Sequence, residues 1–290
     1  MHRHLVIPDA LCADTCVLGK EEARHLQTVL RVKPGDVIQL FDGQGHTRMA
    51  VVSIPPHFMK CGGMEVESKT SKNRLCLTAI EPAINHPQAS CAITLFVCIS
   101  KGKHMEWTIE KAVELGVARI VPVISDRTIV RIDADDRVAK ADRWRRIAEE
   151  AARQCGSAWL PEILAPCAFN ESLSLVQQTT PTFVAALTPE AKPLRDFLLP
   201  VPSSLEPHKP HKNTNNSHPK VLPLCPPCLC EKQYPPPEVG WFVGPEGDFT
   251  PEELQGLLDG GAIPVSLGPL VLRAETACLY GLCALNCAWR

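Results

Sequence analysis

The first 75 residues alternate hydrophobic and polar positions over short stretches, as β-strands do. Residues 37–45 (VIQLFDGQG) and 47–54 (TRMAVVSI) flank a glycine-rich turn and predict a β-hairpin, and residues 64–69 (MEVESK) predict a further strand. One helix is expected over residues 21–31, with four apolar residues on a single face: Ala23, Leu26, Val29 and Leu30. This pattern predicts a small β-barrel module.

From about residue 91 the pattern changes to buried strands alternating with amphipathic helices. Continuous apolar runs predict strands buried on both faces, at residues 91–100, 118–125, 182–187 and 240–244. Apolar residues at helical spacing predict helices at residues 104–116 and 144–156, each ending at a glycine. Alternating strands and helices indicate an α/β fold with a mainly parallel sheet.

The last fifty residues hold two units in which a strand, a glycine-rich loop and a helix follow one another. The first is residues 241–254 (WFVGPEGDFTPEEL), where Thr250 and Glu253 form a capping box with proline at the first helical position. The second is residues 265–282 (VSLGPLVLRAETACLYGL). Open α/β sheets bind ligands at the carboxyl ends of their strands, so these two loops predict a ligand site.

A low-complexity insert occupies residues 197–238, where Pro, His, Asn and Lys dominate. Such a composition buries too little apolar surface to offset the entropy lost on ordering, which predicts a surface loop within the second domain. The insert contains Cys225, Cys228 and Cys230 beside several histidines, a set of zinc-ligand types. There is no second Cys-x-x-Cys pair at zinc-ribbon spacing, so we expect no specific metal site.

Composition describes a globular protein, with 45% hydrophobic and 21% charged residues. No apolar stretch approaches the roughly 18 residues of a membrane span. The fourteen cysteines show no small-domain disulfide spacing, and the amino-terminal residues show no signal peptide. These features favour a cytoplasmic protein; the alternative is a chloroplast or mitochondrial protein whose transit peptide is missing from this chain.

Charge is unevenly distributed, although the net charge is only −2. The front half is mildly basic and the carboxyl-terminal part is acidic, which is compatible with a polyanionic partner and equally with an ordinary solvated surface. Neither the dinucleotide fingerprint G-x-G-x-x-G nor the phosphate-loop motif is present. Arg273 stands at the start of a predicted helix, where a cation is unfavourable, so we expect it to face an anion.

Five blocks of the chain, in order, resemble the RsmE family of ribosomal small-subunit RNA methyltransferases. They are HLQTVLRVKPGDVIQLFDG, SKGKHMEWTIEKAVELGVARIVPVISDRT, RWRRIAEEAARQCG with LPEI, GPEGDFTPEEL and LGPLVLRAETA. The resemblance implies a PUA-like β-barrel domain over residues 1–75 that helps to hold RNA. It also implies a SPOUT methyltransferase domain over residues 76–290, with a carboxyl-terminal trefoil knot, and a homodimeric assembly.

The resemblance further implies S-adenosylmethionine as cofactor and N3 of a uridine in small-subunit (16S-type) ribosomal RNA as the methylated atom. The cofactor-binding residues carried over from the family are Leu187, Thr188, Pro189, Gly244, Pro245, Glu246, Gly247, Ser266, Leu267, Gly268, Leu272 and Thr276. Two positions depart from the family, which usually has glycine at Asp248 and commonly arginine at Leu270. The departure at Leu270 removes a contact to RNA or cofactor.

The expected chemistry assigns two catalytic residues. Uracil N3 carries a proton that must leave, so Arg273 is expected to orient the uridine or its phosphate, with Glu275 as its partner or the proton acceptor. N3 lies on the pairing edge of the base, which must therefore be unpaired or flipped out. Basic residues expected to contact RNA are Arg31, Lys101, Lys103, Arg127 and Arg131.

Two alternatives remain at this stage. One is a non-catalytic RNA-binding protein that kept the fold and lost the cofactor, which Leu270 and the insert would favour. The other is the same fold acting on a different RNA.

Overall fold

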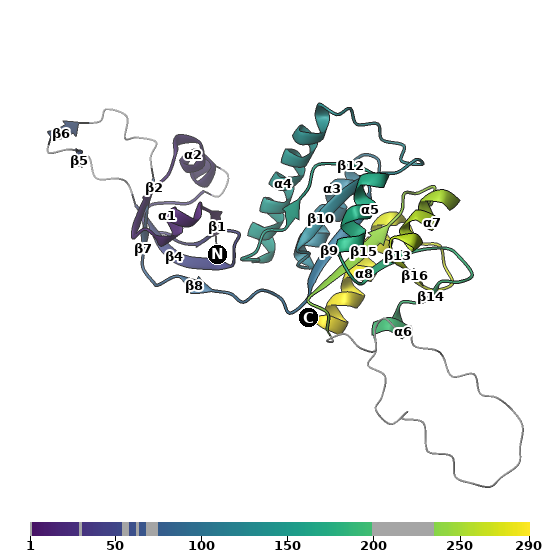
Figure 1. The fold of residues 1–290 in the computed structure, drawn as a ribbon. Helices are drawn as coiled ribbons and strands as arrows, with labels where there is room; N and C mark the ends of the chain where they lie inside the picture. Colours follow the sequence, from purple (N-terminus) through teal and green to yellow (C-terminus); the bar gives the residue numbers. More distant parts are fainter. Residues whose placement is uncertain (1, 29–30, 54–57, 62–63, 68–74, 199–234) are drawn as a thin grey trace, which may run out of the picture. The chain divides into compact units, whose positions relative to one another are not determined.

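The chain forms two compact units (Figure 1). The computed structural model describes residues 2–28, 31–53, 58–61, 64–67, 75–198 and 235–290. Unit 1 contains Met1–Gln88, Ile109–Ala118 and Ala134–Ile163, and unit 2 contains Ala89–Thr108, Arg119–Asp133 and Leu164–Arg290. Most of the predicted insert, residues 199–234 with its three cysteines, lies outside the described residues. None of the described helices is long and apolar enough to cross a membrane.

Unit 1 is built on a six-stranded sheet of order β1-β3-β4-β7-β2, with β8 also pairing with β4. The predicted hairpin is confirmed, because β3 and β4 pair antiparallel. A separate hairpin of β5 and β6 confirms the further strand expected from residue 64. The first sheet continues past residue 75 through β7 and β8. The bounds of these strands are β1 His2–Leu5, β2 Thr15–Val17, β3 Val37–Phe41, β4 His46–Ser53, β5 Phe58–Cys61, β6 Met64–Glu67, β7 Cys76–Ala79 and β8 Ile84–Asn85.

The helix expected over residues 21–31 is shorter in the structure. Helix α2 spans Lys20–Thr28, and Arg31 has a left-handed φ of 54°, which no helix continues through. Ala23 and Leu26 are buried in the core of unit 1, as expected, while residues 29–30 lie outside the described residues. A five-residue helix, α1 (Pro8–Cys12), precedes it.

Helix α4 (Asp136–Cys155) and the residues after it close unit 1 against β1 and the β3–β4 turn. Arg3 is buried; its Nη1 donates to the carbonyls of Ala152 (2.8 Å) and Ser157 (3.0 Å). Gly45 faces the indole ring of Trp159 so closely that a Cβ there would overlap the ring. The chain therefore needs glycine in this turn for the approach as well as for its φ of 96°.

Unit 2 contains a parallel sheet, which confirms the predicted α/β fold. Its strand order is β10-β9-β15-β13-β16-β14, with β12 also pairing with β10, and every one of these pairs is parallel. The strand bounds are β9 Ala92–Cys98, β10 Arg119–Ile124, β12 Cys167–Ala168, β13 Thr182–Ala185, β14 Lys192–Pro193, β15 Glu238–Val243 and β16 Ile263–Ser266. The short strand β11, Glu162–Ile163, belongs to unit 1.

Helices cover both faces of this sheet. Neighbouring residues of a strand point to opposite sides, so each strand contributes side chains to both cores. On one face, Phe242 of β15 stacks on Phe96 of β9 with ring centroids 5.3 Å apart, in a core that includes residues of α5 and α7. On the other face, Trp241 packs against α8, and its Nε1 donates to the carbonyl of Ala277 (3.2 Å). The helix bounds are α3 Lys103–Glu114, α5 Phe169–Gln178, α6 Arg195–Leu198, α7 Pro251–Asp259 and α8 Ala274–Trp289.

Candidate functional site

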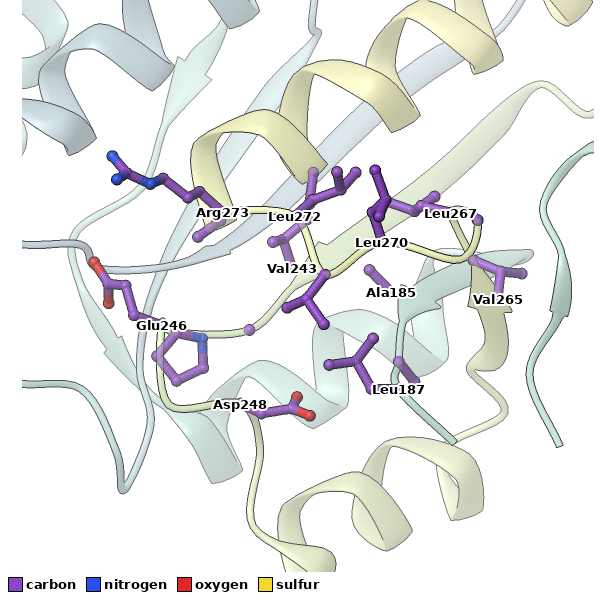
Figure 2. Close-up of a pocket in the computed structure, with 17 residues that line it drawn as sticks. Ala185, Leu187, Val243, Glu246, Asp248, Val265, Leu267, Leu270, Leu272 and Arg273 are labelled. Carbon is purple, nitrogen blue, oxygen red and sulfur yellow. The ribbon is translucent and has the colours of Figure 1, made fainter. Parts of the chain in front are cut away.

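Two loops meet at the carboxyl ends of β13, β15 and β16. Because β13 pairs in parallel with both other strands, all three end at the same edge of the sheet. The loops after β15 and β16, together with the segment after β13, enclose a pocket of about 280 Å³ (Figure 2). This is near the lower end of the usual volume of small-molecule sites.

The first loop, residues 244–249, is held rigidly from within. The N–H of Asp248 donates to the carbonyl of Pro245 (2.9 Å), and Asp248 takes a left-handed φ of 62°. Asparagine and aspartate tolerate this conformation better than most residues, so Asp248 can take the place of the glycine that the family resemblance led us to expect here. The Gly244 Cα lies against the ring of Phe249, so this turn is packed as well as hydrogen-bonded.

The predicted capping box is confirmed and has a further task. Thr250 Oγ1 accepts from the N–H of Glu253 (3.1 Å), and Glu253 Oε2 accepts from the N–H of Thr250 (3.0 Å). The other oxygen, Oε1, accepts from the N–H of Asp126 (2.8 Å), although the side chain is buried. Glu253 thereby fastens the loop that follows β10 to the start of α7.

Arg127 braces the same loop from outside. Its Nη1 donates to the carbonyl of Gly247 (2.7 Å) and to that of Phe249 (3.2 Å). The sequence suggested an RNA contact for this residue; the structure places its guanidinium on the backbone of the pocket loop. Those two bonds engage Nη1, and the side chain as a whole remains exposed.

The second loop, residues 267–273, gives the pocket an apolar rim. Gly268 has a φ of 124°, which favours glycine. Leu270 and Val271 are 73% and 77% exposed, and Leu187 across the pocket is 63% exposed. Exposed aliphatic side chains gathered at a pocket mouth are typical of a surface that a ligand covers.

Charged groups gather on one side of the pocket. Figure 2 shows the side chains of Arg273 and Glu246 extending to the same side, away from Leu267. Two residues beyond Arg273, the carboxylate Oε1 of Glu275 lies 3.3 Å from Nδ1 of His104, in the first turn of α3. The buried thiols nearby are inert: burial raises the pKa of Cys98 to about 12, and burial also raises the pKa of Cys278 well above its ordinary range.

The structure brings together most of the residues that the sequence suggested for a cofactor. The predicted residues that line the pocket are Leu187, Gly244, Pro245, Glu246, Leu267, Gly268, Leu272 and Arg273. The predicted residues outside the lining are Thr188, Pro189, Gly247, Ser266, Glu275 and Thr276. Each of these lies within a few positions of a lining residue along the chain.

Sequence reasoning missed the apolar walls of the pocket. Leu270 and Val271 lie in the second loop, which was expected to bind the ligand, and Asp248 was noted only as a departure from the family; the lining residues not expected there are Ala185, Ala186, Val243, Val265, Ala274 and Ala277. Ala185 and Val243 are the last residues of β13 and β15, so their position at a strand end was the available signal. Among the suggested RNA contacts, Lys101, Lys103 and Arg131 are exposed residues of unit 2, and Arg31 is an exposed residue of unit 1.

The sequence profile of the RNA methyltransferase domain matches residues 87–209 and 218–286. The chain belongs to this RNA methyltransferase family. The profile of the RNA methyltransferase PUA domain also matches, over residues 18–59. The family resemblance suggested by the five sequence blocks is therefore confirmed.

Individual family members show how far the likeness extends. The chain is 26% identical to the ribosomal RNA small subunit methyltransferase E of Synechocystis sp., covering 98% of this chain and 77% of the relative. It is 26% identical to the Bacillus subtilis enzyme of the same name, covering 94% of this chain and 90% of the relative.

Two solved structures of methyltransferases are similar in fold over nearly the whole chain. The ribosomal RNA small subunit methyltransferase E of Neisseria gonorrhoeae, bound to S-adenosylmethionine, has a TM-score of 0.72 at 26% identity and covers 100% of this chain and 98% of its own. A Legionella pneumophila methyltransferase in complex with the same cofactor has a TM-score of 0.74 at 25% identity and covers 99% and 97%.

Proposed function

We propose that this chain methylates N3 of a uridine in small-subunit (16S-type) ribosomal RNA, using S-adenosylmethionine. The observation that carries the proposal is the pocket between the loops after β15 and β16, in a chain whose solved relatives hold that cofactor. The proposal extends the relatives' named activity to this chain.

The pocket residues fit the proposed cofactor. Aliphatic walls from Leu187, Leu267 and Leu272 suit the apolar face of an adenine, and the carboxylates of Glu246 and Asp248 suit a cationic ligand. Backbone groups of the glycine-rich loop suit the polar edges of the base and of the methionine portion. When bound, S-adenosylmethionine supplies a methyl group on a positively charged sulfur.

The catalytic roles proposed for this chain belong to residues beside the pocket. Arg273 holds the uridine and stabilises the negative charge that develops on the uracil oxygens as the N3 proton leaves. Glu275 acts in removing that proton, either directly or through the imidazole of His104 beside it. Because methyl transfer needs the reacting atoms aligned, positioning by the rigid loops supplies much of the rate.

The finer architecture is part of the same proposal. We propose a PUA-like β-barrel over about residues 1–75 and a SPOUT domain over about residues 76–290 whose carboxyl-terminal part forms a trefoil knot. Strands β15 and β16 follow one another along the chain but are separated in the sheet by β13, and this crossing connection supports the proposed knot. The exposed bases Arg31, Lys101, Lys103 and Arg131 are the proposed RNA contacts, together with the remaining donors of Arg127.

We also propose a homodimer and a cytoplasmic location. Helix α8 supports the dimer, because none of its exposed positions carries a charge: Thr276, Tyr280, Cys283, Cys287 and Ala288. A second copy of the chain is the proposed cover for this stripe. Sedimentation at micromolar concentration tests it, since a monomer would refute the assembly.

Two measurements test the function. Purified protein is incubated with small ribosomal subunits and S-adenosylmethionine, and the RNA nucleosides are then resolved by mass spectrometry; N3-methyluridine should appear. Its absence, with another methylated nucleoside in its place, would refute the substrate and favour a different RNA. Calorimetry with S-adenosylmethionine tests the non-catalytic alternative, which requires that millimolar cofactor does not bind.

A further inference from the structure

The contact between His104 and Glu275 joins two helix starts that lie far apart in the sequence. His104 is the second residue of α3, and Glu275 is the second residue of α8. The Nδ1 atom of the histidine and Oε1 of the glutamate are 3.3 Å apart. Figure 2 places Arg273, two residues before this glutamate, at the charged side of the pocket.

The difference in exposure between the two side chains indicates which of them a substrate base can touch. The side chain of Glu275 is 14% exposed, whereas that of His104 is 54% exposed. A carboxylate is favoured in the first turn of a helix, because the backbone N–H groups there are partly positive. The shielded carboxylate therefore stands behind the imidazole, and the imidazole is the group that an arriving base can touch.

A carboxylate beside one ring nitrogen of a histidine fixes the tautomer of the ring. With Nδ1 protonated toward Glu275, the lone pair of Nε2 is available on the other side of the ring. This is the arrangement by which a carboxylate orients a histidine base and stabilises the imidazolium that forms.

We propose that His104 is the proton acceptor for uracil N3 and that Glu275 is its positioning residue. This inference rests on the proposed uridine-N3 methylation and assigns the proton step within it. The N3–H bond breaks and its proton passes to Nε2 of His104. The electron pair left on N3 forms the bond to the methyl carbon, and the pair of the breaking carbon–sulfur bond stays on sulfur, which loses its positive charge. The imidazolium then returns its proton to water.

The surrounding charges suit this role. The charged groups of the two segments that meet at His104 are Lys101, Lys103 and Glu106 on one side and Arg273 and Glu275 on the other. Three cations attract an RNA backbone to this side, and Arg273 is placed to stabilise a deprotonated base.

The test combines rates with a measurement that needs no turnover. In single-turnover methylation at saturating cofactor, His104→Gln should slow the reaction roughly 100-fold, the lower range for loss of a general base. Its rate should also rise in proportion to hydroxide across pH 6–9, whereas the wild-type rate should rise less steeply because the protein itself supplies the base. The dissociation constant of S-adenosylmethionine, from calorimetry, should stay within about twofold.

The partner residue has its own readout and a matched control. Glu275→Gln should remove the preference of His104 for a proton on Nδ1, followed by the ring nitrogen chemical shifts in NMR of the cofactor-free protein and assigned with His104→Gln. Glu252→Gln is the control, because it removes a first-turn carboxylate from α7, at an exposed position with no histidine contact among the described residues. It should leave the ring nitrogen shifts of His104 and the rate unchanged.

The outcomes separate this inference from the function it rests on. A wild-type protein that makes no N3-methyluridine refutes the proposed function itself. An active wild type with an unchanged rate and pH profile in His104→Gln overturns the inference. So does a Glu275→Gln variant that loses activity while His104→Gln keeps it, because Glu275 would then be the base.

Discussion

Replacing Gly281 by alanine tests the packing of α8, which carries one wall of the pocket. A Cβ at this position would overlap Cε2 and Nε1 of Trp241 and would lie 2.5 Å from Cδ2. Ordinary carbon contacts are about 3.5–4.0 Å long, so ring and helix must separate by roughly an ångström or more. Trp241 is fully buried on β15, which is paired on both sides, so the helix is the part that moves.

The magnitude follows from two opposing terms. Overpacking a well-filled core costs about 1–3 kcal/mol, and the rigid ring favours the upper end. Alanine gains about 1 kcal/mol over glycine inside a helix. The net loss is about 2 kcal/mol, which corresponds to a fall in melting temperature of roughly 4–8 °C.

Gly256→Ala on α7 is the matched control, with the opposite sign. The nearest atom to a Cβ there is Leu173 Cδ1 at 3.6 Å, an ordinary contact. That variant should gain up to about 1 kcal/mol, or roughly 2–4 °C. Scanning calorimetry of both variants checks the pair. The packing argument is wrong if Gly281→Ala melts at or above the wild-type temperature.

Three further outcomes are expected. Arg127→Ala should weaken S-adenosylmethionine binding roughly fivefold to tenfold in calorimetry by releasing the pocket loop, about 1–1.4 kcal/mol, and an alanine variant with wild-type affinity would contradict the brace. Burial alone would raise the pKa of Asp42, but hydrogen bonds from the N–H groups of Gln44 and His46 and from the His46 ring lower it below its ordinary 3.8. The stabilising effect of Asp42 is therefore complete above pH 3.8 and is lost as the pH falls through the lower folded pKa. Asp42→Asn should unfold at a lower urea concentration at neutral pH, and its free energy of unfolding should fall less than that of the wild type as the pH is lowered. The same pH dependence of that free energy in both proteins would exclude the effect. Iodoacetamide at pH 8 should label the exposed Cys12 and spare Cys98, whose pKa burial raises to about 12; mass spectrometry of peptides that found Cys98 labelled as fast as Cys12 would show that the core is open.

The parts of the fold that the sequence predicted are those with strong local signals. A few adjacent residues are enough to predict the conformation at three places: the apolar run of β9, the capping box at Thr250, and the glycine-rich turn between β3 and β4. Helix α5 was missed because its N-cap is Ala168, which offers no side-chain cap. The end of α2 was misplaced because helical spacing continued through residue 31, while the chain turns left-handed there.

The site divides in the same way. Glycine, proline and charged residues mark the loops, so Gly244, Pro245 and Arg273 were expected and line the pocket. Val243 and Ala185 carry no chemical signature, and only the sheet order brings them together. The pairing of His104 with Glu275 depends on two helix starts meeting in space, which no spacing in the sequence encodes.

The hydrogen bonds of Arg3 can form only late in synthesis of the chain. Arg3 is held by the carbonyls of Ala152 and Ser157, and the β3–β4 turn is covered by Trp159. At about 5–20 residues per second, the ribosome takes roughly 8–30 s to reach those partners after Arg3 has been made. The amino-terminal sheet therefore lacks these contacts until about half of the chain has been translated. A fragment that stopped at residue 88 would never acquire these contacts, and its buried guanidinium would lack both carbonyls.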